Sequence, residues 1–171
     1  MRTRIIVALA AAGNLALTSL SSRAEDEARN ATALAKALGE ANVSLDQGLK
    51  ASARDGTPIS GKFELEDGAL QLSVYTMKGD QFSEVIVDHK SGALKKTEKI
   101  TDGDDLKEAK EQSQAMAKAK LPLDQAVTSA VTANAGYRAV SVVPALKSGA
   151  PVANVTLMKG GDVKEVMEKL D

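Results

Sequence analysis

The chain has 171 residues, of which 43% are hydrophobic and 26% charged, and its net charge is −1. This length suits one ordinary domain or two small ones. Cysteine and tryptophan are absent and there is a single histidine, which excludes disulfides, thiol nucleophiles, zinc–thiolate sites and histidine-rich metal centres. Since most familiar catalytic chemistry is excluded with them, we expect no enzyme, no resident metal and no cofactor.

Residues 1–24 have the pattern of a secretory signal peptide. Arg2 and Arg4 precede an apolar run over 5–12, and no acidic residue occurs within the segment. The pattern predicts cleavage after Ala24. An uncleaved anchor is the alternative, but the apolar run is shorter than the roughly 20 residues that span a bilayer. We therefore expect a periplasmic or secreted protein that is not inserted in the membrane after cleavage.

The charge of the exported part argues against nucleic acid as a partner. Cleavage removes three arginines and no acid, which leaves 19 basic against 23 acidic residues and a net charge of −4. A negative chain repels phosphate backbones. A chain exported without cysteines suits a bacterial periplasm, where its fold would depend on its hydrophobic core alone.

Two short sequence matches indicate that the exported part is duplicated. Leu45-Asp46-Gln47 recurs 78 residues later, and Met77-Lys78-Gly79 recurs 81 residues later. Because the matches occur in the same order, we predict a first repeat over 25–100 and a second, shorter repeat over 101–171.

Each predicted repeat opens with two helices. Apolar residues at three- and four-residue spacing predict a helix over about 26–39 and its counterpart over about 104–119. A shorter helix follows each of them. Ser44 and Gln47 have the spacing of a capping box at the start of the first short helix, and Pro122 suits the first turn of the second.

Alternating apolar and polar residues then predict strands with one buried face. They cover about 59–66, the segment between turns at 67–68 and 79–80, 82–88 and 93–100 in the first repeat, and 137–146, 150–158 and 163–170 in the second. The lysines of 93–100 indicate an exposed sheet edge. The fold class predicted is α+β, with two tandem α-α-β-β-β(-β) repeats forming antiparallel sheet and helices packed on one face.

One stretch of the first repeat carries a family pattern. A hairpin reads Gly-Lys-Phe-Glu-Leu-Glu-Asp-Gly over 61–68 and Leu-Ser-Val-Tyr over 72–75, then a strand ends in Val-Asp at 87–88 and a turn follows at Gly92. This arrangement resembles a PepSY domain. The second repeat resembles the family more loosely, because its last strand keeps only the final acid.

The resemblance implies a two-layer fold similar to the tandem-repeat beta-lactamase inhibitory protein. It also implies a binding or inhibitory role in the cell envelope, with no catalytic residues. PepSY units occur in the propeptides of thermolysin-like metallopeptidases, so a copy without its own protease domain would act in trans.

The open face of the first predicted hairpin is our candidate partner-binding site. Tyr75 is its central residue, because a tyrosine on a sheet surface presents a rigid amphipathic ring at low entropic cost. The alternative is that Tyr75 packs across strands. The other candidates on this face are Lys62, Glu64, Gln71, Ser73 and Met77.

Other polar residues are predicted to be structural. His89 follows a strand in a polar turn that offers no cleft and no orienting group, so we expect a solvated histidine and not a general base. Asp102, Asp104 and Asp105 lack the ligand spacing of a calcium loop and are expected to begin the next helix.

The leading hypothesis is thus an exported PepSY-type binding module that docks an envelope protein, such as a protease, and inhibits or regulates it. The alternative is a periplasmic protein that binds a small ligand or a metal ion. An enzyme is the least favoured class.

Overall fold

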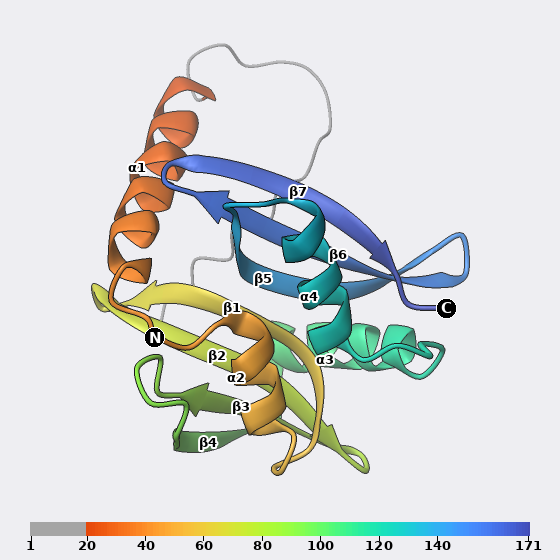
Figure 1. The fold of residues 1–171 in the computed structure, drawn as a ribbon. Helices are drawn as coiled ribbons and strands as arrows, with labels where there is room; N and C mark the ends of the chain where they lie inside the picture. The colour runs from red at the N-terminus through yellow and green to blue at the C-terminus, as the bar shows by residue number, and fades with distance from the viewer. Residues whose placement is uncertain (1–19) are drawn as a thin grey trace.

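The computed structural model describes the backbone of residues 20–171 and the side chains of residues 28–171. These residues form an α+β fold with four helices and one antiparallel sheet of seven strands (Figure 1). The helices are α1 (Leu20–Leu38), α2 (Leu45–Ser52), α3 (Gly103–Met116) and α4 (Leu123–Ala133). The strands are β1 (Thr57–Glu66), β2 (Ala69–Lys78), β3 (Gln81–Val87), β4 (Leu94–Ile100), β5 (Arg138–Lys147), β6 (Ala150–Lys159) and β7 (Asp162–Lys169). The predicted helices and strands are confirmed, with small shifts at their ends.

The start of the chain differs most from the prediction. α1 begins at Leu20 and not near residue 26, so the predicted cleavage point after Ala24 falls inside this helix. Residues 1–19, which make up most of the predicted signal peptide, lie outside the described residues. None of the helices from residue 20 onward is both long and apolar enough to cross a membrane.

A single sheet joins the two halves of the chain, in the order β4-β3-β2-β1-β5-β6-β7. The junction is a short antiparallel pairing of β1 with β5, in which Gly61 opposes Val142 and Lys62 opposes Ser141. β4 and β7 are the outer strands, which confirms the predicted edge at 93–100. Each central hairpin also contains a register shift, near Ile59 between β1 and β2 and near Val140 between β5 and β6.

α2 and α4 cover one face of this sheet, called the inner face below. Gly61 shows how closely α2 approaches β1, because a Cβ atom there would lie 3.2 Å from Leu49 Cδ2 and 3.4 Å from Leu45 Cδ1. Leu45 begins α2, where the predicted capping box is present. The main core fills the space between these helices and the strands, with completely or almost completely buried Leu45, Leu49, Leu72, Val74, Leu123, Val127, Val142, Val155 and Leu157.

α3 lies on the opposite face, called the outer face below, so the prediction that all helices pack on one face is wrong. Figure 1 shows α2 and α4 in front of the strands and α3 behind them. Ser60, which precedes Gly61 in β1, donates a hydrogen bond to Gln112 Oε1 of α3 at 2.7 Å. A second, smaller core forms there from buried Ile59, Phe82 and Ala109. The physical reason is that the outer face carries its own apolar residues, which α3 removes from water.

α1 packs at the end of the first half. Leu38, near its C-terminus, is buried in the main core, and Leu34 and Ala35 are partly buried against it. The helix contacts β1 and β2. The apolar stripe predicted in this segment therefore serves the main core.

Candidate functional site

The predicted site residues come from two neighbouring strands and share the outer face. Lys62 and Glu64 belong to β1, where they oppose Ser73 and Gln71 of β2. Tyr75 and Met77 follow on the same face of β2, since side chains two residues apart point the same way. The structure thus brings all six candidates onto one sheet surface.

Four of these side chains form one connected polar network. The Lys62 ammonium lies 2.7 Å from Glu64 Oε2, and the Ser73 hydroxyl donates to Glu64 Oε1 at 2.9 Å. The Gln71 amide in turn donates to the Ser73 hydroxyl at 2.9 Å. Lys62 and Glu64 are only 26% and 20% exposed, and Ser73 is fully buried. The network therefore holds these side chains in place through contacts within the chain itself.

Tyr75 lies at the border between this network and the second core. Its ring is partly buried against that core, as is the Met77 side chain. The Lys62 ammonium lies 5.9 Å from the centre of the Tyr75 ring, within the range of a cation–π contact. Tyr75 consequently has a packing role, and the part of the ring that stays exposed is held in one orientation.

α3 adds an acidic group close to Lys62. Burial raises the pKa of the Glu108 carboxyl, the charge of Asp105 raises it further, and Lys62 opposes both effects. The outer face of the first half is closed at one end by α3, so it is less open than the alternation alone predicted.

Glu84 is a buried acid that the sequence analysis did not include among the site residues. It opposes Tyr75 across β2 and β3 and is only 3% exposed. A hollow of about 300 Å³ lies beside it, lined also by Glu98, Asp102 and Asp105. The alternation of its strand could have identified Glu84, because it places this residue on the same face as Tyr75. From residue 28 onward, no group of three acidic or histidine side chains is arranged to hold a metal ion.

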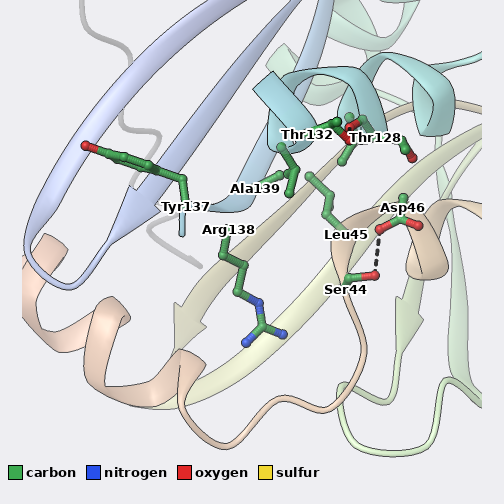
Figure 2. Close-up of a pocket in the computed structure, with 10 residues that line it drawn as sticks. Ser44, Leu45, Asp46, Thr128, Thr132, Tyr137, Arg138 and Ala139 are labelled. Carbon is green, nitrogen blue, oxygen red and sulfur yellow. Dashed lines mark hydrogen bonds between the residues drawn. The ribbon is translucent and has the colours of Figure 1, made fainter. Parts of the chain in front are cut away.

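A second hollow opens between α2, α4 and β5 (Figure 2). Its volume is about 210 Å³, below the roughly 300 Å³ at which small-molecule pockets begin. Its polar groups are engaged within the chain. The Ser44 hydroxyl donates to Asp46 at 2.6 Å, and the Arg138 guanidinium donates to the carbonyl oxygens of Leu38, Ala41 and Val43 at 2.8 to 3.1 Å. The residues around this hollow therefore connect elements of the fold, and Arg138 links β5 to the end of α1 and the loop after it.

His89 is not the solvated residue that its turn predicted. Its side chain is partly buried, and Nδ1 is buried without a hydrogen-bond partner. Its carbonyl oxygen accepts hydrogen bonds from the Asn42 and Val43 amides, which tie the turn after β3 to the loop before α2. Asp102 does occupy the N-cap position of α3, although its side chain makes no capping hydrogen bond.

Comparison with known proteins assigns neither a family nor a function to this chain. No family model, no curated protein and no solved structure matches the chain.

Proposed function

We propose that this protein is an exported, non-catalytic binding module of the PepSY type, which docks a folded protein of the cell envelope. A protease is the partner class that the resemblance favours, with inhibition or regulation in trans as the outcome. The observation that carries the proposal is the ordered network of Lys62, Glu64, Gln71 and Ser73 beside Tyr75.

An ordered surface of this kind favours protein recognition for an entropic reason. Binding usually costs about 0.5 to 1.5 kcal/mol for each flexible side chain that becomes fixed. Here Glu64 already contacts both Lys62 and Ser73, so its side chain loses its conformational freedom on folding and not on binding. The partly exposed Tyr75 ring then supplies an apolar anchor, with charges of both signs around it. A partner surface with complementary charges and a pocket for the ring would fit.

We also propose that the two halves are tandem repeats. Three observations support this. The register shifts in the two central hairpins begin at Pro58 and Ala139, which are 81 residues apart. Gly61 and Val142, which pair at the centre of the sheet, have the same separation. The strands of each half also follow outward in chain order from that centre.

The test uses the exported protein, tagged at its C-terminus and purified from its own envelope extract, with mass spectrometry of bound proteins and calorimetry of each candidate. We expect Tyr75→Ala to weaken binding of the partner at least about tenfold, as for a central aromatic anchor. Tyr137→Ala is the matched control, since Tyr137 is the chain's other tyrosine and lies in the second half.

Equal partner binding by wild type and Tyr75→Ala, with both variants folded as judged by their melting temperatures, would contradict the proposed face. A large rise in melting temperature with calcium or zinc, and no protein partner, would favour the small-ligand or metal-binding alternative.

A further inference from the structure

The two edges of the sheet are built differently. The edge at β4 carries Lys95, Lys96 and Lys99 against the single acid Glu98, and its pairing with β3 contains a register shift. Lysines and irregular pairing are two ways in which proteins prevent an edge strand from joining another chain. β4 is therefore a protected edge.

β7 is less protected than β4, because its two lysines, Lys164 and Lys169, are outnumbered by three acids. It pairs with β6 without a register shift, from Lys159 opposite Asp162 to Val152 opposite Lys169. Among residues 20–171, no strand pairs with its other side. Its Val163 and Met167 are 46% and 48% exposed, the highest values among the large exposed hydrophobic residues of the described chain. A regular, exposed edge with apolar side chains is suited to pairing with a further strand.

The charges of β7 complement a second copy of the same strand. In an antiparallel pair centred on Met167, Glu165 of each copy opposes Lys169 of the other, so two cross-strand ion pairs form. Within the described residues, no hydrogen bond or ion pair engages the side-chain charges of Glu165 or Lys169. The two Met167 side chains meet at the twofold axis on the outer face. The corresponding pairing of β4, centred on Thr97, would oppose Lys95 to Lys99 twice and Lys96 to Glu98 twice. Because each copy of β4 carries three lysines against one acid, this pairing is repulsive overall.

We propose that β7 is a self-association edge, through which two copies of this chain pair antiparallel to form one continuous sheet. The interaction is isologous, because each copy supplies the same strand. Backbone hydrogen bonds provide the attraction, and the Glu165–Lys169 pairs fix the register. The strand contact is small, so we expect a reversible dimer with a dissociation constant in the micromolar range.

The test measures the mass of the purified exported chain by sedimentation equilibrium over a range of concentrations. Wild type is expected to shift from monomer to dimer. Glu165→Lys and Lys169→Glu each oppose like charges twice, so each is expected to weaken the dimer about tenfold or more. The double variant Glu165→Lys with Lys169→Glu restores both attractions and is expected to dimerise like wild type. An equimolar mixture of the two single variants is expected to form a mixed dimer for the same reason.

Lys99→Glu is the matched control, because it makes the same charge change on the β4 edge and should leave the dimer unchanged. A wild-type chain that stays monomeric throughout would overturn the proposal. So would two single variants that dimerise like wild type, or a double variant as weak as the singles, provided that melting temperatures show all proteins folded. Tyr75→Ala separates this edge from the proposed partner site, since it should leave self-association unaffected.

Discussion

The strands of each half of the sheet run outward in chain order, but the two halves differ in chemistry on the outer face. In the first half, Lys62 and Glu64 of β1 belong to the polar network beside Tyr75. At the positions 81 residues further on, β5 carries Val143, which is 39% exposed, and the half-buried Ala145. The same backbone pattern therefore accepts a charged pair or an apolar pair. The inner faces of both halves thus contribute to one shared core, whereas these outer-face positions differ in chemistry between the halves.

The largest expected effects test whether the inner faces of the two halves are equivalent. Leu45 and Leu123 begin α2 and α4 and are 0% and 2% exposed in the same core. Leu45→Ala and Leu123→Ala should each lower the free energy of unfolding by about 3 kcal/mol, because each leaves a cavity in a packed core. Urea denaturation followed by circular dichroism measures this, and should show a single transition in each variant.

Leu121→Ala is the control for these two variants, since Leu121 is 40% exposed and its truncation should change stability little. Two separate transitions, of which a substitution moves only one, would show that the halves unfold independently.

A smaller loss of unfolding free energy is expected at Arg138, whose contacts with the end of α1 have no counterpart among the described residues of the first half. Arg138 donates to the carbonyl oxygens of Leu38, at the end of α1, and of Ala41 and Val43 in the loop that follows. Its guanidinium carbon lies 5.4 Å from the centre of the Phe63 ring. Arg138→Ala leaves those carbonyls without their donor and should cost about 2 kcal/mol of unfolding free energy, measured by urea denaturation.

Arg138→Lys should lose less stability than Arg138→Ala, because lysine keeps a charged donor. It should still be less stable than wild type, because it lacks the planar fork of donors. The position 81 residues earlier is the exposed Thr57, where Thr57→Ala should change stability by less than about 0.5 kcal/mol. Equal losses of unfolding free energy in Arg138→Ala and Thr57→Ala would argue that the Arg138 hydrogen bonds do not stabilise the fold.

The smallest expected effect depends on pH and concerns the turn after β3. Asp88 lies 2.8 Å from the Lys95 ammonium and accepts from the Ser91 and Lys90 amides, which together hold the pKa of its carboxyl well below the usual range. A depressed pKa in the folded state means that the stabilisation is present above the unfolded-state pKa of about 4 and is lost as the pH falls through the folded-state value.

Asp88→Asn should therefore be less stable than wild type at neutral pH, and the gap should narrow on acidification below about pH 4. Thermal denaturation across this range measures the gap. Asp80→Asn, at the exposed turn between β2 and β3, should follow the wild-type profile. A gap that stays constant as the pH falls would show that the Asp88 charge is not the source of the stabilisation.

Local pattern predicted the elements well because each depends on neighbours in the chain. Alternation between 59 and 66 placed β1, and the Asp67-Gly68 turn, where both residues have positive φ angles, closes the first hairpin as predicted. The Ser44 amide donates to Gln47 Oε1 at 2.9 Å, as the capping-box spacing indicated. The same alternation placed the six candidate residues on one face, but not the ion pair and hydrogen bonds among them.

The errors arose where distant segments meet. The stripe of α3 shows that one side of the helix is buried but does not say which face of the sheet it covers, and Ala109 packs with Phe82 on the outer face. His89 appeared solvated because its turn is polar, whereas its side chain is partly buried and its carbonyl oxygen accepts hydrogen bonds from the Asn42 and Val43 amides of another loop.

The sequence by itself determined the order of helices and strands, the hairpin turns and the division into inward and outward residues, because these follow from local propensity and from the periods of helix and strand. Only the tertiary structure decided that β1 joins β5 into one sheet, that α3 covers the outer face, and that β7 is the edge opposite β4. The physical reason is that these features depend on contacts between residues far apart in the chain. Their stability comes from shared burial and backbone pairing, which no single segment encodes.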